Sequence, residues 1–163
     1  MVAYNFNLNT DDVEKAKIIA QNIRESGYQR LENGVKVRKA GKFKALKSLG
    51  WYISDYKIAQ VSCNFTDLDV TPLHLVHEAV CEEAEKLGVS VTGGELIGLI
   101  PLKVMTEAGR FYLQKRGHEI YDSDWKLAWV AVDYLGLSDL RFFELDKKVI
   151  EYMIYAKPNA VQP

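Results

Sequence analysis

Residues 50–88 read GWYISDYKIAQVSCNFTDLDVTPLHLVHEAVCEEAEKLG, and this stretch decides the fold. Its alternation from Ile58 to Phe65 predicts a β-strand with two unlike faces. One face suits a protein core and carries Ala59, Val61, Cys63 and Phe65. The other face carries mostly short hydrogen-bonding side chains: Ile58, Gln60, Ser62 and Asn64. A solvated sheet face more often carries long charged side chains, so this amide-bearing face needs an explanation.

Upstream, residues 2–9 read VAYNFNLN and predict a half-buried strand with the same property. Its apolar face carries Val2, Tyr4, Phe6 and Leu8, and its polar face carries Ala3, Asn5, Asn7 and Asn9. Thr10 or Asp11 is expected to cap the helix that follows, and Gly27 to end it. In the less regular segment after this helix, Asn33-Gly34 predicts a tight turn.

Downstream, a strand at residues 45–52 joins the strand at 58–65 through the turn SDYK. Such a short connection predicts an antiparallel hairpin. Thr71 is expected to cap a helix that has Pro72 at its first position and runs to Leu87. Residues 89–92, VSVT, predict one more short strand.

The remaining elements are extra to this core. Pro101 is expected to open a helix that runs to about residue 116, and Ser123 to cap a last helix that Gly136 ends. KKVIEYMIYA, residues 147–156, predicts a final strand. No linker divides the chain, so we expect a single domain over residues 1–155 and a disordered tail over 156–163.

The order strand, helix, strand, strand, helix, strand defines the expected fold class. It is an α/β (α+β) fold with a ferredoxin-like split βαβ core, in which a mixed or antiparallel sheet has its helices on one face. The extra C-terminal helices and strand are appended to this core. In this arrangement the strands at 2–9 and 58–65 are central neighbours, and both core helices cover the same face.

The two amide-bearing strands would therefore lie side by side. The expected patch, on the face away from the helices, consists of Asn5, Asn7, Gln60, Ser62 and Asn64. Short amides suit fixed hydrogen bonding, so this face would meet a polar ligand, a second layer of protein, or both. A merely polar outer face is the alternative that the pattern leaves open.

Composition excludes several classes of function. The chain has 163 residues, a net charge of −1 and no apolar run long enough to cross a membrane. The N-terminus reads as a strand and a helix start rather than a signal peptide. Cys63 and Cys81 are too few for a disulfide framework, so free thiols and a cytoplasmic location are expected.

One helix stripe and one glycine pair carry candidate chemistry. His74, His77 and Cys81 are spaced as zinc ligands could be, but a fourth ligand is missing and apolar neighbours favour packing, so no metal is predicted. His74 lies in the first helical turn, where a neutral imidazole can hydrogen bond in a binding or a structural role. TGGEL lacks the phosphate-loop and dinucleotide patterns, so its glycines predict a bulge or a close approach. Glu95 after them is either aimed at a ligand or solvated.

Positive charge is concentrated in one run, which contains Lys36, Arg38, Lys39, Lys42, Lys44 and Lys47. This run is a solvated loop or attracts a polyanion, and Phe43 is the only aromatic residue within it that could stack a base. Nucleic acid is therefore not expected as a partner. No nucleophile, base and orienting group form a recognisable set, so the chain reads as a binding half rather than a catalytic centre.

Several blocks resemble the C-terminal subdomain of glutamate formiminotransferase, which also forms the front part of formiminotransferase-cyclodeaminase. The blocks are YNFNLNT, LGWYISDYKIAQVSCNFTDLDVTPLHLVHEAV, VTGGELIGLIPLK and VIEYMI. The resemblance runs from about Val2 to Ile154. It implies two α/β subdomains whose sheets face each other, with folate between them and a catalytic histidine in the N-terminal subdomain. No position of this sequence corresponds to that histidine.

The resemblance also implies a reaction. The family moves a formimino group from N-formimino-glutamate to tetrahydrofolate in histidine breakdown. This chain would be the folate-binding half, without transferase activity of its own, and its partners would be folate, formimino-glutamate and the N-terminal formiminotransferase subdomain. The residues expected to bind folate or the donor are Asn5, Asn7, Gln60, Ser62, Asn64, Glu95 and His74.

The chain departs from the family pattern within residues 119–133. Trp129 and Tyr134 stand where more basic residues are expected, so this chain does not supply there an arginine for the substrate carboxylates. The basic insertion ENGVKVRKAGKFK resembles bacterial members and could attract the glutamate tail of folate. The rival hypothesis is a non-catalytic binding or scaffold protein of the same fold, either a homodimer that pairs polar sheet faces or a partner of a separately encoded N-terminal half.

Overall fold

Four antiparallel strands form the central sheet of the chain. The computed structural model describes residues 1–155, and the predicted tail, 156–163, lies outside the described residues. The sheet has the order β4-β5-β1-β6, in which the strands are Leu46–Ile53, Ile58–Phe65, Val2–Leu8 and Val91–Ile97. β1 and β5 are the central neighbours, so the ferredoxin-like order expected from the sequence is confirmed.

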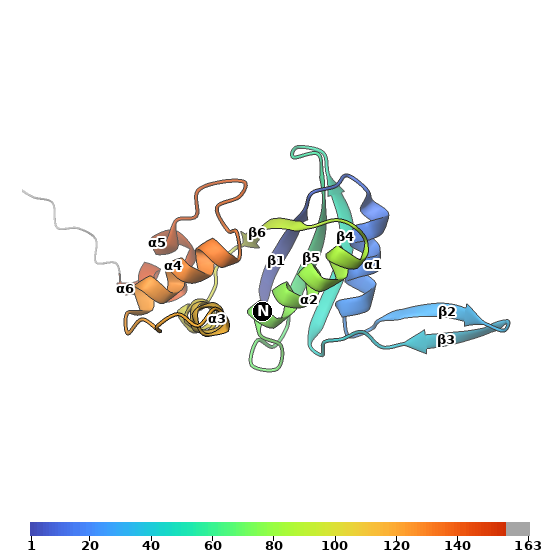
Figure 1. The fold of residues 1–163 in the computed structure, drawn as a ribbon, viewed down its shortest axis with the longest axis horizontal. Helices are drawn as coiled ribbons and strands as arrows, with labels where there is room; N and C mark the ends of the chain where they lie inside the picture. Colours follow the sequence, from blue (N-terminus) through green and yellow to red (C-terminus); the bar gives the residue numbers. More distant parts are fainter. Residues whose placement is uncertain (156–163) are drawn as a thin grey trace, which may run out of the picture.

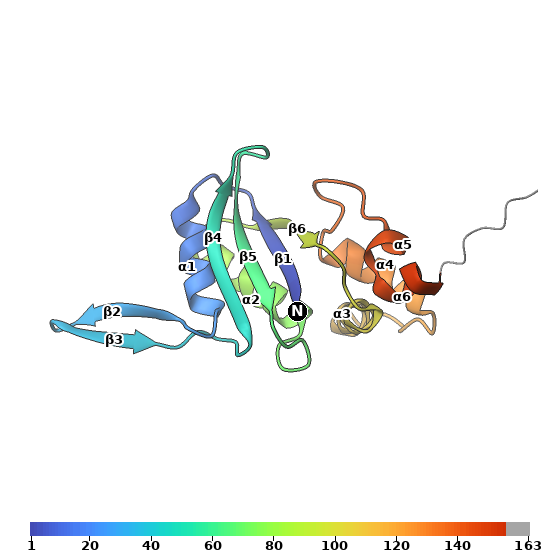
Figure 2. The same ribbon diagram turned by 180° about the vertical axis from the view of Figure 1, so that it is seen from behind.

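Two helices cover one face of this sheet. These are α1, Val13–Ile23, and α2, Leu73–Lys86. α2 lies in front of the strands in Figure 1, and the strands lie in front when the molecule is turned in Figure 2. Gly50 of β4 faces α1, because a Cβ there would lie 2.2 Å from the backbone nitrogen of Lys17. The neighbours of Gly50 in β4 therefore point to the opposite, open face.

The alternate apolar side chains of both central strands form the core beneath these helices. The buried residues of this parity are Val2, Tyr4, Phe6, Leu8, Ala59, Val61, Cys63 and Phe65. They belong to one cluster of buried apolar side chains that extends to Val149 near the C-terminus. Burial raises the pKa of Cys63 to about 12, so this thiol is neutral.

The N-caps of α1 and α2 differ from the expected ones by a residue. The N-cap of α1 is Asp12, whose carboxylate accepts from the Glu14 backbone N–H at 3.0 Å, rather than Thr10 or Asp11. Pro72 occupies the N-cap position of α2, and no side chain caps that helix. The hydroxyl of Thr71 instead donates to the Lys44 carbonyl at 2.5 Å, which ties the start of α2 to the loop before β4.

Between α1 and β4 the chain forms a separate hairpin. Its strands are β2, Tyr28–Glu32, and β3, Val35–Lys39. The predicted turn is confirmed, because Asn33 and Gly34 both have positive φ, of 51° and 80°, as a two-residue hairpin turn requires. Figures 1 and 2 both show this hairpin projecting from the body, with nearly all of its residues exposed.

The paired glycines of β6 allow two close approaches. A Cβ on Gly94 would lie 1.8 Å from the Tyr4 hydroxyl, and one on Gly93 would lie 2.5 Å from the Gly136 carbonyl oxygen. The pairing of β1 with β6 also shifts register between Asn7 and Leu8. Both parts of the prediction for TGGEL, a bulge and a close approach, are therefore confirmed.

The described C-terminal part consists of helices and their connections, and it lies beyond the β6 edge of the sheet (Figure 1). Its helices are α3, Leu102–Lys115, α4, Asp124–Tyr134, α5, Leu145–Lys148, and α6, Ile150–Tyr155. The final strand predicted at residues 147–156 is therefore wrong within the described residues. Only one parallel bridge forms there, between Ile100 and Val149. A short apolar run fits either a strand or a helix, and here the Glu151 side chain accepts from the first N–H of α3 at 2.6 Å.

A buried histidine joins α2 to α3. His77 Nδ1 lies 2.7 Å from the Tyr112 hydroxyl, and burial lowers the pKa of His77 to about 4.

None of the helices described between residues 1 and 155 is long and apolar enough to cross a bilayer.

The His77 pair makes stability depend on pH. Because its pKa is lower in the folded chain than the value of about 6.5 expected after unfolding, the unfolded chain binds the proton first. The contribution is complete above about pH 6.5 and is lost as the pH falls towards 4, by up to about 3 kcal/mol. Urea unfolding between pH 7 and 4 should show a smaller loss for His77→Gln, and an unchanged loss for the exposed His118→Gln. Equal pH profiles for His77→Gln and the parent would contradict this.

Candidate functional site

The amide-bearing residues lie together on the open face of the sheet. The register pairs Asn7 with Gln60 and Asn5 with Ser62 between the central strands, and Asn5 with Glu95 between β1 and β6. Asn64 is paired with Ala3 one step further along. All are on the parity opposite the apolar core, so the structure places them in one patch away from α1 and α2.

Direct hydrogen bonds connect these side chains into a network across all four strands. Gln60 Nε2 donates to Asn7 Oδ1 at 2.7 Å, and Gln60 Oε1 accepts from Trp51 Nε1 at 3.0 Å. Longer contacts of 3.4 and 3.5 Å join Glu95 Oε2 to the side-chain nitrogens of Asn5 and Gln60. We call these five side chains, Trp51, Gln60, Asn7, Asn5 and Glu95, the amide network.

A loop outside the sheet anchors one end of the network. Asn7 Nδ2 donates to the Asp139 carboxylate at 3.2 Å, and Thr92 donates to the same oxygen at 3.0 Å. Trp51, Thr92 and Asp139 were not predicted as site residues. Trp51 could have been found from the hairpin register, which puts it directly opposite Gln60. Asp139 carries no such signal, because it lies 132 positions from Asn7.

Burial within the network is uneven. Asn7 and Gln60 are 0% exposed, and their partners include Asp139 of the loop and Trp51 of β4. Asn5 is also buried, whereas Ser62, Asn64 and Glu95 are half-buried and reach the surface. The buried amides therefore hold the geometry of the face, and the half-buried residues are the ones that a ligand can touch.

Exposed apolar side chains surround the network on the same face. Leu49 is 52% exposed and Ile97 is 49% exposed, and both lie on the parity of the amides. A large apolar side chain on an open sheet face stays in unfavourable contact with water unless another layer covers it. The face combines fixed polar groups with a partly apolar surround, which is the composition of a surface that binds a ligand or a protein layer.

A cavity of about 260 Å³ opens beside Glu95. Its walls come from β6 and from the segment that leads through α5, and they include Glu95, Arg141, Phe142 and Lys148. Its two cations, Arg141 and Lys148, lie outside residues 119–133, the region where the sequence departs from the family pattern. At the earlier position, Tyr134 stacks on Tyr112, with ring centroids 4.8 Å apart.

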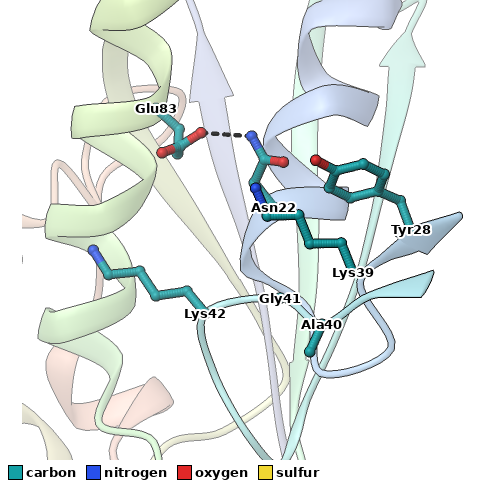
Figure 3. A pocket seen from close by; sticks show the side chains of 7 residues that line it. All are labelled: Asn22, Tyr28, Lys39, Ala40, Gly41, Lys42 and Glu83. Atoms are coloured by element: carbon teal, nitrogen blue, oxygen red, sulfur yellow. Dashed lines mark hydrogen bonds between the residues drawn. The ribbon is translucent and has the colours of Figure 1, made fainter. Parts of the chain in front are cut away.

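A second cavity, of about 420 Å³, lies on the helix side of the sheet (Figure 3). Asn22, Lys39, Lys42 and Glu83 line it where the β2–β3 hairpin leaves the body. Figure 3 shows the Asn22 amide directed at Glu83, to which it donates at 2.6 Å. Lys42 is paired with Glu82, outside the cavity wall, at 3.1 Å. Asn22 and Glu83 thus satisfy each other, Lys39 lies over the Tyr28 ring, and the cavity is on the opposite side of the sheet from the amide network.

The sequence is similar to that of several known proteins. Residues 3–155 match the formiminotransferase domain family. The chain is 40% identical over 156 residues to the formimidoyltransferase-cyclodeaminase of Gallus gallus, covering 96% of this chain and 27% of that protein. It is 36% identical over 163 residues to the protein of the same name from Dictyostelium discoideum, covering 100% of this chain and 29% of that protein.

A shorter relative gives the same result. The glutamate formimidoyltransferase of Streptococcus pyogenes serotype M1 is 37% identical over 114 residues, which are 70% of this chain and 34% of that protein. The chain belongs to the formiminotransferase domain family. The resemblance found in the sequence is therefore confirmed, and the chain spans about a third or less of the length of these relatives.

One predicted site residue of this formiminotransferase domain lies elsewhere. His74 is on α2, on the opposite side of the sheet, where its ring packs 4.5 Å from that of Phe111. Burial lowers its pKa, which agrees with a neutral imidazole. Its binding role remains a prediction, but the structure separates it from the other six residues. On the same helix, His77 Nε2 is 3.9 Å from Cys81 Sγ, and no group of three metal-ligating side chains forms within residues 1–155.

The amide network predicts a specific stability difference. Gln60→Leu would leave the side-chain oxygen of Asn7 and the indole N–H of Trp51 without their partner. We expect this to lower the free energy of unfolding by about 1–3 kcal/mol. Ser62→Ala, on the same strand and face but half-buried, should change it by less than about 0.5 kcal/mol. Urea titration of both variants measures the difference, and equal effects would show that the network does not hold the face.

Proposed function

We propose that this chain is the folate-binding C-terminal half of a glutamate formiminotransferase, which transfers a formimino group from N-formimino-glutamate to tetrahydrofolate. The observation that carries the proposal is the open sheet face, where a fixed amide network meets exposed apolar side chains. Family membership supports the class of reaction, and the name of the Streptococcus pyogenes relative, glutamate formimidoyltransferase, supports a glutamate derivative as the donor.

In this proposal the chain's own residues bind and position the substrates. Ser62, Asn64 and Glu95 contact folate or the donor, while Asn5, Asn7 and Gln60 hold the face in shape. Proximity then accelerates the transfer, because two bound substrates react as if in one molecule. The folate nitrogen forms a bond to the formimino carbon, the bond to the glutamate nitrogen breaks, and the leaving amine takes up the proton that folate loses.

Catalytic groups come from an N-terminal formiminotransferase subdomain, whose sheet covers the open face. The lengths of the relatives support such a partner, since this chain matches only 27–29% of the two formimidoyltransferase-cyclodeaminases described above. Tetrahydrofolate serves as co-substrate, and general acid–base help is supplied by the partner. The free thiols of Cys63 and Cys81 support a reducing compartment, so we place the activity in the cytoplasm.

A scaffold without chemistry is the second candidate, and the burial of Asn7 and Gln60 favours it, since both are satisfied within the chain. Such a scaffold would form a homodimer through the open face or pair with a separately encoded N-terminal half. Folate binding in the presence and absence of that half separates the two candidates.

Calorimetry with a stable reduced-folate analogue tests the proposal. We expect binding when an N-terminal half is added, and no turnover by this chain alone. Leu49→Glu should weaken assembly and folate binding at least about tenfold, because it buries an unpaired charge in the apolar surround. Leu31→Glu, on the exposed hairpin, is the matched control and should leave both unchanged. Absence of folate binding in both settings would reject the enzyme half in favour of the scaffold.

A further inference from the structure

The cavity beside Glu95 carries charges that the proposed function does not use. Arg141 and Lys148 are in its wall, opposite β6, and neither forms an ion pair with any residue from 1 to 155. Glu144 is also in the wall, and its carboxylate forms an exposed ion pair with Lys147 at 2.6 Å. The cavity therefore presents two cationic side chains that form no ion pair within residues 1–155.

Glu95 supplies the opposite charge at the other side of the cavity. Its Oε2 accepts the two long contacts from the amide network, whereas its Oε1 accepts no side-chain hydrogen bond within the described residues. The carboxylate is half-buried and lines the cavity. One oxygen is thus held by the sheet while the other is available to a ligand that donates.

Two cations and one available carboxylate define the ligand chemistry. The complementary molecule has two carboxylates and, at a short distance from them, a planar cation with N–H groups. N-formimino-glutamate has this arrangement, because its amidine is a strong base that is protonated at neutral pH. Its amidinium can donate two parallel hydrogen bonds to a carboxylate, as a guanidinium does.

Resting on the proposed function, we infer that this cavity is the donor subsite, in which Glu95 binds the formimino group and Arg141 and Lys148 bind the two carboxylates. A volume of about 260 Å³ is sufficient for a glutamate derivative. Glu95 lies at the boundary with the amide network, so the formimino carbon would be held at the edge of the face proposed for folate.

The glutamate tail of folate is the other source of the same dicarboxylate chemistry. Its nitrogen is an amide and carries no charge, so it would place nothing positive beside Glu95. A bare dicarboxylate would also be repelled by that residue. Discrimination by charge at the formimino position therefore separates the donor from the folate tail.

The test uses N-formyl-glutamate, an analogue that keeps both carboxylates but is uncharged at the formimino position, because oxygen replaces the protonated nitrogen. Because every wall of the cavity comes from this chain, calorimetry on the 163-residue chain alone is sufficient. We expect N-formimino-glutamate to bind at least about tenfold more tightly than the formyl analogue, the ratio typical of one charge-assisted contact. Glu95→Gln, which keeps the shape, should bring the ratio close to one.

The cationic side is tested separately. Arg141→Ala combined with Lys148→Ala should weaken both compounds by at least about tenfold. Lys36→Ala combined with Lys126→Ala removes the same charge from exposed sites and should change neither affinity by more than about twofold. Thermal melting of each variant checks that the fold is kept.

Equal affinity of the parent chain for the two compounds, or no binding of either, would overturn the donor subsite. Tighter binding of N-formyl-glutamate, whose nitrogen is an amide like that of the folate tail, would assign the cavity to the folate tail instead. Failure of folate to bind with the N-terminal half would reject the proposed function without affecting this measurement, because no folate is present in it.

Discussion

The register between β1 and β5 decides which side chains lie on each face of the sheet. On the polar face it pairs Asn7 with Gln60, whose side chains form a hydrogen bond of 2.7 Å. A slip by one residue would turn every side chain of one strand to the wrong face. Tyr4 and Phe6 would then leave the core, and Asn7 would enter it without a partner. Burial of the apolar parity and pairing of the amides therefore select the same register.

Most of the fold was predictable because its signals are local. Alternation in residues 2–9 and 58–65, the Asn33-Gly34 turn and the Ser123 cap each act over a few residues, and each is confirmed. The predicted strand at residues 147–156 failed because its pattern is shared by helices and strands. Tertiary contacts decided it, through the bond from the Leu102 N–H to Glu151.

The candidate site was predictable only in part, because some of its residues are brought together by tertiary contacts rather than by local signals. Parity and topology placed Asn5, Asn7, Gln60, Ser62 and Asn64 together, since the strand order fixes their neighbours. Asp139 and Arg141 lie on a loop whose path depends on the close approach of Gly136 to Gly93. No periodicity in the sequence encodes that approach, so neither the anchor of the network nor the cationic wall of the cavity could be predicted.

The β2–β3 hairpin has a practical consequence. Its tip at Asn33-Gly34 is exposed and projects beyond the β4 edge, at the other end of the molecule from the helices that follow β6 (Figures 1 and 2). Exposed loop tips tolerate inserted sequence well. A fluorescent reporter or an affinity tag placed between these two residues would therefore leave the sheet intact, and would allow assembly with other subunits to be followed without touching either terminus.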